Sequence, residues 1–411
     1  MGIRRAEMAP PPGLALSGYL DAAATTPPAA AVLAAMVEAQ ELAWANPSST
    51  HGFGLAAAEA LERSRERIAT LLGTVADQVI LCSGGSEAIH LALLGLAADL
   101  EPGRLVISTV EHPATLAAAA QLERRGWEVA AVPVDRRGVV DLAALPALLR
   151  PPTRLMSVIW GQNEVGTLQP INAIGRLCRE AGVLLHVDAV QVVGHLPVRL
   201  DQLPVDLLSC AAHKLQGPRG IGALLLRPGL RLSPLIGGGG QEGGRRGGTE
   251  PVVLAVGFAQ ALALAQERLQ AHDGHDPLGP LRDGLLERLL AMEGIRLSGP
   301  AVDDPLGRLP HHLSLLVSGA SGQPMSGRQL VRALWGEGYA VSSGSACSSG
   351  RGAGAGGPAP SPVLLALGYG AAEAASGLRF SLGPWLGPSD LEGVPAALAR
   401  ARDRLGRTGA G

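Results

Sequence analysis

Short, continuously apolar runs alternate with longer segments of helical periodicity between about residues 60 and 230. The apolar runs predict strands at 79–82, 105–108, 129–133, 155–160, 183–187, 207–210 and 223–226. The segments between and around them predict helices at 54–72, 86–98, 113–125, 141–149 and 171–181. Strands that are apolar on both faces belong to sheets covered by helices on both sides. The pattern therefore predicts an α/β fold with a mainly parallel seven-stranded sheet, whose ligands collect beyond the carboxyl ends of the strands.

The pattern changes after about residue 263, where we expect a second, smaller domain. A long helix at 250–270 and a polar stretch at 272–277 precede a mixture of helices and strands, predicted at 278–292, 295–298, 312–317 and 326–336. Shifts of this kind mark domain boundaries. The expected division is a flexible N-terminal segment (1–18), a large domain (19–263) and a small α+β domain (264–411), which carries a loop at 342–362.

Composition narrows the class of protein. A net charge of −2 and a pI near 6.6 give no electrostatic basis for binding nucleic acid or an anionic membrane. No apolar run is long enough to span a membrane without an interrupting charge, proline or glycine, and residues 1–17 lack the apolar core of a signal peptide. The four cysteines have no metal-binding spacing, and three lie in apolar or helical patterns: Cys82, Cys178 and Cys210. We expect a soluble cytoplasmic protein without an intrinsic metal site.

Lys214 occupies an unusual position, where a buried strand gives way to a glycine-rich turn. An ammonium near a core is costly unless it is paired, deprotonated or chemically used. Taken alone, the residue is better explained as a lysine that extends from a strand end to solvent. The rest of the chain decides between the two interpretations.

Other polar residues stand just beyond predicted strands, at the expected ligand edge. Asp188 ends one strand and, if buried, needs a cationic partner or several hydrogen-bond donors; Gln191 follows it. Gly85 and Ser86 open a helix, where small residues let the backbone approach an anion and the helix end favours phosphate. We expect Ser86 to cap that helix. Each feature alone also has a structural explanation, since a turn needs glycine and a cap, and Asp188 can cap the turn after it.

His112 and Asn163 follow two further predicted strands. A lone histidine in such a place is more often a core or cap residue than a catalyst. Arg379 lies in a short apolar strand, where a nearly buried guanidinium usually has a carboxylate partner, and a substrate could supply it.

Two loops carry reactive or anion-binding groups. Eight of the twelve residues 237–248 are glycine, which implies a loop with close backbone approach. Arg245 and Arg246 in this loop, and Thr249 just after it, suit phosphate or carboxylate. Cys347 precedes residues 348–360, which are almost wholly Ser, Gly, Ala and Pro, the composition of a flexible tether. A thiol at the root of a tether differs from an inert core cysteine.

Together these residues meet the requirements of pyridoxal 5'-phosphate (PLP). That cofactor needs a Schiff-base lysine, an acid against its pyridine nitrogen, a phosphate cup and an arginine for the substrate carboxylate. The chain offers Lys214, Asp188, Gly85 with Ser86, and Arg379. These residues occur together at predicted strand ends. This favours a cofactor-binding Lys214 over a lysine that only extends to solvent.

From about residue 19 to 386 the chain resembles the cysteine desulfurase family, in the class V aminotransferase group with the PLP-dependent transferase fold. The segments that carry the resemblance are 19–26, 46–51, 83–87, 111–112, 163–166, 186–191, 213–214, 248–249, 342–347 and 379–383. The Ser-Ser-Gly-Ser-Ala-Cys run before a long loop is similar to the NifS/IscS-like subgroup, which feeds sulfur to iron–sulfur assembly. The resemblance implies a homodimer that acts on L-cysteine and passes sulfur to an iron–sulfur scaffold or other acceptor proteins, including thio-cofactor and tRNA thiolation pathways.

The resemblance also implies how the cofactor is held. Lys214 would carry it as a Schiff base and transfer protons, and Asp188 would pair with the pyridinium. His112 would stack on the ring, while Asn163 and Gln191 would bind its phenolic oxygen. The residues expected at the phosphate are Gly85, Ser86, His213 and, from the other subunit, Thr249.

For the substrate, the resemblance implies that Asn46 and Arg379 clamp the carboxylate. The thiolate of Cys347 would attack the sulfur of the bound cysteine and leave alanine and a persulfide. Cys347 could also serve as a transient iron–sulfur ligand.

The chain departs from the family pattern in two places. Two positions before His213 the family usually has a hydroxyl residue that binds the phosphate, whereas this chain has Ala211. A missing hydrogen bond to a charged acceptor weakens binding by about 1–2 kcal/mol. The segment after Cys347 is longer and richer in glycine than usual, with Arg351 its only charge, and this bears on partner docking more than on chemistry.

Three alternatives remain open at this point. Two are enzymes of the same fold, a selenocysteine lyase and a class V aminotransferase, of which the aminotransferase has no need of Cys347. The third is a catalytically silent interaction subunit, which predicts the loss of Lys214, Asp188 or Cys347; all three are present.

Overall fold

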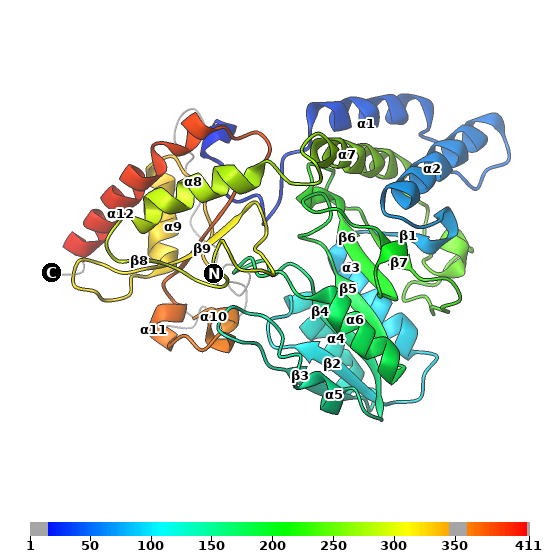
Figure 1. Ribbon diagram of the computed structural model, residues 1–411. Helices are drawn as coiled ribbons and strands as arrows, with labels where there is room; N and C mark the ends of the chain where they lie inside the picture. Colours follow the sequence, from blue (N-terminus) through cyan, green and yellow to red (C-terminus); the bar gives the residue numbers. More distant parts are fainter. Residues whose placement is uncertain (1–14, 345–359, 409–411) are drawn as a thin grey trace.

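The computed structural model describes residues 15–344 and 360–408, which build two parts, each around its own sheet (Figure 1). The larger sheet has seven strands in the order β1-β7-β6-β5-β4-β2-β3. Their bounds are β1 Val79–Cys82, β2 Arg104–Ser108, β3 Glu128–Val132, β4 Thr153–Ile159, β5 Leu184–Asp188, β6 Leu207–Ala211 and β7 Gly222–Leu226. Of these strands only β7 runs against the common direction, so the sheet is mainly parallel, as predicted.

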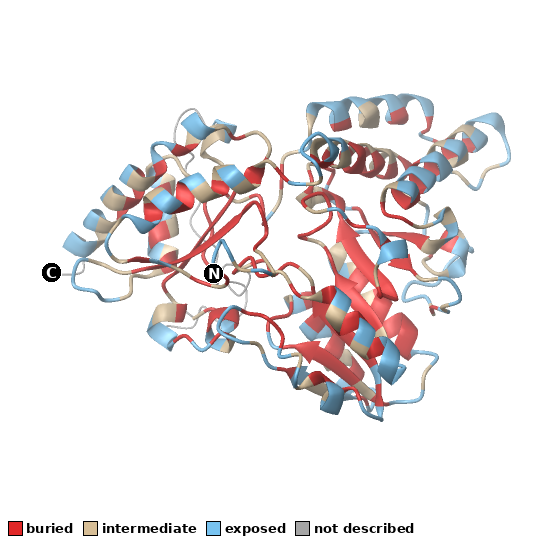
Figure 2. Ribbon diagram, viewed as in Figure 1, coloured by how far each residue is buried: buried red, intermediate tan, exposed pale blue. Residues whose placement is uncertain are grey.

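Helices cover both faces of this sheet, which explains why its strands are apolar throughout (Figure 2). Side chains alternate between two separate cores: in β1, Val79 and Leu81 pack with one, and Ile80 and Cys82 with the other. The first core includes residues of α2, α6 and α7, and the second includes residues of α3, η4 and α4. The helices of this part are α1 Ala30–Leu42, α2 Gly52–Leu71, α3 Gly85–His90, η4 Leu91–Gly95, α4 Pro113–Glu123, α5 Leu145–Leu148, α6 Ile171–Ala181 and α7 Val252–Gln270.

The smaller part is built on a three-stranded antiparallel sheet in the order β10-β9-β8. Its elements are α8 Leu278–Leu290, β8 Ile295–Leu297, β9 His312–Val317, α9 Gly327–Gly336, α10 Pro362–Ala366, α11 Ala371–Ala374, β10 Gly377–Ser381 and α12 Val394–Thr408. Leu20 packs into the core of this part, although the chain then continues into α1 of the larger part. The packing supports a boundary between α7 and α8, slightly later than the expected one at 263, and the division into domains remains a prediction.

The predicted strands of both sheets and most helices match the structure within a few residues. Helix α5 is a single turn, where a helix at 141–149 was expected, because residues 142–144 form turns and Pro146 stands near its start. The helices α1 and α12 and the short helices α10 and α11 were not predicted. Exposed apolar residues such as Leu33 and Val37 of α1 obscure its periodicity.

One helix in the described chain, α7, is long and apolar enough to cross a membrane by length and composition alone. More than half of it (56%) is buried inside the protein, and it lies beside α1 and α2 (Figure 1). Phe258 and Ala255 on this helix are fully buried in the core of the larger part. Its apolar character is therefore explained by packing.

Helix α8 offers a matched test of the core of the smaller part. Leu285 is 0% exposed and Leu290 is 43% exposed on the same helix. Leu285→Ala should lower the free energy of unfolding by about 2–5 kcal/mol, because it removes buried methyl groups and leaves a cavity. Leu290→Ala should change it by less than about 1 kcal/mol. Denaturant unfolding of both variants measures the difference, and equal losses would contradict the assigned packing.

Candidate active site

The carboxyl ends of β1, β2, β4, β5 and β6 point to one edge of the larger sheet, because β1 is antiparallel to β7 and β7 to β6. A cavity of about 460 Å³ lies at this edge. Nine of the predicted site residues line it: Gly85, Ser86, His112, Asn163, Asp188, Gln191, His213, Lys214 and Arg379. Residues far apart in the sequence thus face one space, as the position of the strand ends predicted.

Lys214 reaches this cavity from a single helical turn (Ala212–Lys214) that directly follows β6. Its Nζ donates hydrogen bonds to the carbonyl oxygens of Ala23 (2.5 Å) and Ala24 (2.8 Å). The amine therefore points toward an inner wall of the site. A lysine that only extended from a strand end to solvent would not do so.

Asp188 and His112 are two buried titratable groups of the cavity. Asp188 is 3% exposed and accepts a hydrogen bond from the backbone N–H of Val190 at 3.0 Å. Burial raises the pKa of the Asp188 carboxyl, and burial lowers the pKa of His112. Both shifts disfavour the charged forms, so a cationic group that enters the cavity would stabilise the Asp188 carboxylate. His112 also caps α4, where its Nδ1 accepts from Ala114 N at 3.1 Å.

The histidine two positions before Asp188 in the sequence has a structural role. His186 lies between the hydroxyls of Ser157 and Ser209, at 2.8 Å from each. Burial lowers its pKa to about 3, so it is a neutral core residue. It does not line the cavity.

The expected phosphate side is built by the turn after β1 and the turn after β6. Helix α3 is capped by Gly84, so the expectation that Ser86 caps it was wrong: the helix begins one residue before Ser86. A Cβ placed on Gly85 would lie 2.7 Å from Cγ2 of Val190 and 3.8 Å from Cβ of Ala211. Only glycine fits there, and the methyl group of Ala211 stands beside the place where a phosphate ligand is expected.

His213, on the same side, lies with its Nδ1 3.1 Å from Oγ1 of Thr25. Burial, followed by the nearby charge of Lys214, lowers the pKa of His213 to about 4. The ring is therefore neutral at physiological pH and can offer one N–H as a hydrogen-bond donor.

Arg379 on β10 has a carboxylate partner within its own chain. Its Nη2 donates to Oδ1 of Asp21 at 2.7 Å, and its Nη1 donates to the carbonyl oxygen of Asn163 at 2.9 Å. Its buried Nε has no hydrogen-bond partner among the described residues. Asp21 also lines the cavity; it lies in the segment 19–26 that carries the family resemblance, but no role was assigned to it from the sequence.

Two expected site residues, Asn46 and Thr249, do not line this cavity. Asn46 is exposed, and its Oδ1 accepts from Ser48 N at 2.9 Å. Thr249 is exposed beside the glycine-rich loop. Cys347 lies outside the described residues, although Ser342, a few residues earlier, lines the cavity and pairs with Arg379 through the backbone.

The arginines of the glycine-rich loop are paired with carboxylates of the protein. Arg246 Nε donates to Glu87 at 2.9 Å, and Arg245 bonds the backbone and side chain of Asp77. Glu242 of the same loop forms a buried bidentate pair with Arg65 at 2.6 and 2.9 Å. These contacts fix the loop on α2 and α3, and they account for both arginines without a ligand.

Glu111 is a buried acid beneath the cavity to which the sequence assigned no role. Its Oε1 accepts hydrogen bonds from the hydroxyl of Ser108 (2.5 Å) and from Ile159 N (2.9 Å), and its Oε2 has no partner in the described chain. Burial raises its pKa to about 8.

The cavity residues fit PLP. A lysine amine, a buried acid, an imidazole, two amide side chains and a glycine-lined turn surround one space of suitable size. Lys214 would hold the aldehyde carbon, Asp188 the ring nitrogen, and the turn at Gly85 and Ser86 the phosphate. The hydroxyl that Ala211 lacks is missing from the phosphate side.

Comparison with known proteins identifies the class. The family model "Aminotransferase class-V" matches residues 18–393, and the chain belongs to this PLP-dependent family. Among curated relatives, "Cysteine desulfurase IscS" of Dictyoglomus turgidum (strain DSM 6724 / Z-1310) is 38% identical over 390 residues, covering 94% of this chain and 95% of the relative. "Cysteine desulfurase" of Klebsiella pneumoniae is 39% identical over 390 residues, covering 94% and 93%.

Solved structures agree. One described as "NIFS-LIKE PROTEIN" superposes with a TM-score of 0.82 at 32% identity and covers 94% of this chain and 99% of its own. One described as "SspA in complex with cysteine" has a TM-score of 0.76 at 32% identity and covers 89% and 99%. The α/β fold of the PLP-dependent transferases is confirmed.

Glu111→Gln tests the buried acid through the pH dependence of stability. The carboxyl pKa is raised from 4.5 to about 8 in the folded chain, so the folded state binds this proton more tightly than the unfolded state. The protonated Glu111 carboxyl therefore contributes fully to the free energy of unfolding below its pKa in the unfolded chain. This contribution is lost as pH rises through its pKa in the folded chain. Glutamine resembles the protonated acid, so the melting temperature of Glu111→Gln should exceed that of the wild type by an amount that grows from about pH 5 to about pH 8 and is constant above it.

The exposed Glu59→Gln is the control for that series, since its side chain is 65% exposed. Its melting temperature should follow the wild type at every pH. A Glu111→Gln variant that did the same would show that Glu111 is ionised in the folded chain.

Proposed function

We propose that the chain is a PLP-dependent cysteine desulfurase, which takes sulfur from L-cysteine and leaves L-alanine. One observation carries this proposal: Lys214, Asp188 and Arg379 line a single cavity, in a chain 38–39% identical to named cysteine desulfurases over 94% of its length. A lysine, an acid and an arginine are the groups that PLP chemistry on an amino acid requires.

Each residue has a task that its contacts support. PLP, when bound, supplies the electron sink for bond changes at the substrate's α and β carbons. Lys214 holds or moves a proton at Nζ, and the carbonyls of Ala23 and Ala24 hold this amine when it carries three protons. Arg379 binds the substrate carboxylate, and Asp188 holds the charge of the ring nitrogen.

Cys347 is the sulfur acceptor in this proposal. Its thiolate attacks the sulfur of the bound cysteine, the Cβ–S bond breaks, and Cβ takes up a proton, so that one cysteine and one thiol become alanine and a persulfide. The described residues that flank residues 345–359 support this role: Ser342 lines the cavity, and the hydroxyl of Ser361 bonds Glu164 at 2.6 Å, beside Gly344. A segment of 15 residues, at about 3.3 Å each, is long enough to reach both the cavity and a partner.

A homodimer is the second part of the proposal. The surface that carries Asn46 is unusually apolar, with Trp44 61% and Phe53 64% exposed and their rings 5.7 Å apart. Leu42 and Leu55 are exposed on either side of them. Such a patch on a chain of this size marks an interface, and a second copy there would carry Asn46, and Thr249 as well, toward its partner's cavity.

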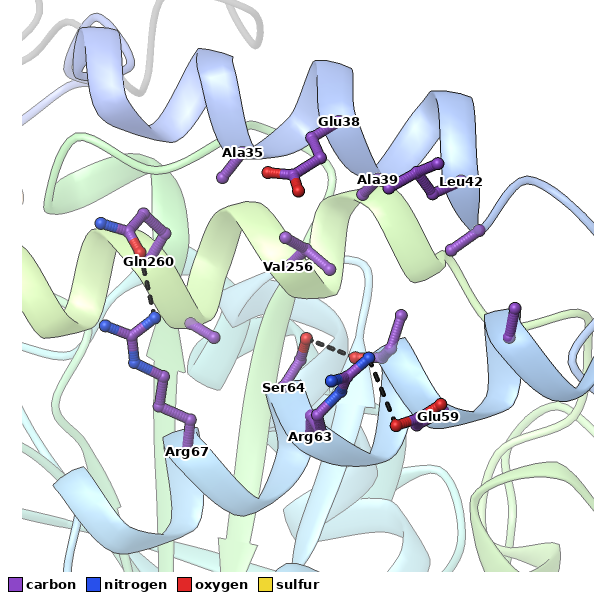
Figure 3. A pocket seen from close by; sticks show the side chains of 14 residues that line it. Ala35, Glu38, Ala39, Leu42, Glu59, Arg63, Ser64, Arg67, Val256 and Gln260 are labelled. Carbon is purple, nitrogen blue, oxygen red and sulfur yellow. Dashed lines mark hydrogen bonds and ion pairs between the residues drawn. The ribbon is translucent and has the colours of Figure 1, made fainter.

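The groove beside this patch lies between α1, α2 and α7 and encloses about 400 Å³ (Figure 3). Four charged residues line it: Arg63 pairs with Glu59 at 3.5 Å, Arg67 bonds Gln260 at 3.0 Å, and Glu38 of α1 lies across the groove from them. Leu42 and its apolar neighbours Ala35, Ala39 and Val256 form much of the remaining lining. We assign the groove to the dimer surface rather than to a small-molecule site.

The sulfur acceptors and the compartment complete the proposal. The relatives named IscS support an iron–sulfur scaffold, or another acceptor of thio-cofactor or tRNA thiolation pathways, as the recipient of the persulfide. A cytoplasmic location is consistent with cysteines that function as thiols: Cys82, Cys178 and Cys210 are buried and free.

The alternatives have less support. A silent interaction subunit would not need Lys214 and Asp188 to line one cavity, and an aminotransferase would not need Cys347. A selenocysteine lyase would use the same cavity, and the names of the relatives favour cysteine.

Cys347→Ser tests the proposed reaction. The variant should bind PLP with absorbance between about 390 and 430 nm, because Lys214 and the cavity are intact. Its release of sulfide and alanine from L-cysteine under reducing conditions should fall at least about a hundredfold, since the hydroxyl cannot accept sulfur. Cys178→Ser, at a buried position, is the control and should retain turnover. Unchanged turnover of Cys347→Ser would exclude the persulfide mechanism, and a protein that stays colourless with added PLP would favour the silent subunit.

Ala211→Ser tests the departure at the phosphate side. A hydroxyl at this position, beside Gly85, should add a hydrogen bond to the phosphate and lower the dissociation constant of PLP about tenfold, or about 1.4 kcal/mol. Ala211→Cys has a similar volume and a weaker donor, so it should change the constant much less. Titration of the apoprotein with PLP measures both, and an unchanged constant in Ala211→Ser would show that the phosphate lies elsewhere.

A further inference from the structure

Asp21, which pairs with Arg379 in the cavity, belongs to a segment held between the two parts of the protein. Ala22 N and Ala23 N donate to the backbone oxygen (3.1 Å) and hydroxyl (2.8 Å) of Ser381 on β10. On the other side, Nε2 of Gln191 donates to Ala23 O at 2.8 Å. With both sides bonded, the backbone around Asp21 is fixed, and its carboxylate is presented to the cavity in one place.

Asp21 and Arg379 form an ion pair that is only partly shielded from solvent. The Nη2–Oδ1 distance is 2.7 Å, and the side chains are 20% and 5% exposed, Asp21 being the more accessible. Both residues line the cavity. The positive charge of Arg379 is therefore already balanced before any substrate enters.

The guanidinium still has room for a ligand. Of its five N–H groups, one bonds Asp21, one bonds the carbonyl oxygen of Asn163, and Nε has no partner in the described chain. Because Nε is buried, a substrate carboxylate would use the second N–H of Nη1 or of Nη2, beside the negative charge of Asp21. Among the residues that line the cavity, the cations Lys214 and Arg379 face the acids Asp21 and Asp188.

This balance distinguishes amino acids by their charge. L-cysteine with a neutral thiol brings one carboxylate. An amino acid with an anionic side chain brings a second negative charge, for which the described lining of the cavity offers no third cation. Like charges placed close together disfavour the wrong ligand more than the right one.

We propose that Asp21 is a specificity-determining residue, which occupies one edge of Arg379 and weakens the binding of amino acids that carry a second anionic group. The proposal rests on the function proposed above, in which Arg379 receives the substrate carboxylate. It predicts that neutralising Asp21 strengthens the binding of all carboxylate ligands, and of dianionic ones most.

Asp21→Asn tests the charge while keeping the size and the oxygen that Arg379 bonds. The absorbance change of the PLP-loaded protein gives the dissociation constants of L-alanine and L-aspartate, neither of which is desulfurated. In Asp21→Asn the ratio of the aspartate constant to the alanine constant should fall about tenfold, because one repelling charge is lost. The KM of L-cysteine should fall less than the KM of L-cysteine sulfinate.

Two further variants make the result decisive. Asp21→Ala removes both the charge and the hydrogen bond, and should show the same fall in ratio with weaker binding of both ligands. Asp77→Asn removes a carboxylate that is 90% exposed and distant from the cavity, and should leave the ratio unchanged. An unchanged ratio in Asp21→Asn, or an equal rise of both constants, would overturn the specificity role and leave Asp21 as a support for Arg379. A wild-type protein that forms no alanine from L-cysteine would contradict the proposed function, whatever the ratio.

Discussion

The site depends on one constraint of parallel β-structure: the carboxyl ends of parallel strands meet at one edge of the sheet. Because β2, β4, β5 and β6 run in the same direction, the residues just beyond them face a common cavity. His112, Asn163, Asp188 and Lys214 are brought together in this way. The two helical layers bury the rest of each strand, so the polar residues at this edge are the ones left to bind a ligand.

The cavity is closed from the other side by contacts that the sheet alone does not provide. Arg379 comes from β10 of the smaller sheet, and Asp21 from the segment that runs between the two parts. Lys214 and Arg379 thus both meet this N-terminal segment, one through the carbonyls of Ala23 and Ala24 and the other through Asp21. The position of the two parts relative to each other consequently sets the distance between the amine and the guanidinium.

Local patterns of apolar and polar residues predicted the larger sheet and much of the site. Continuous apolar runs located the strands. Residues just beyond those runs, such as Asp188 and Lys214, were expected at the ligand edge of the sheet and line the cavity at that edge. Helix α1 was missed because its exposed face is also apolar, which removes the contrast on which periodicity depends. The same exposed apolar face of α1 supports the proposed homodimer interface.

Pairings made by the tertiary fold could not be predicted. Nothing near Arg246 in the sequence indicates that its partner is Glu87, and a ligand was the natural expectation for an arginine in a glycine-rich loop. In the same way Asp21 reaches Arg379 only because the chain folds back onto β10. The sequence indicates which groups can bind an anion, and the structure shows which of them are already occupied.

The central claim is that sulfur from L-cysteine passes to Cys347. The most direct measurement is the mass of the Cys347 peptide after the PLP-loaded protein has reacted with L-cysteine and free thiols have been blocked. The account predicts a gain of one sulfur atom, about 32 Da, on this peptide, with an equal amount of L-alanine. Alanine formed with no added sulfur on Cys347 at any time of reaction would contradict it.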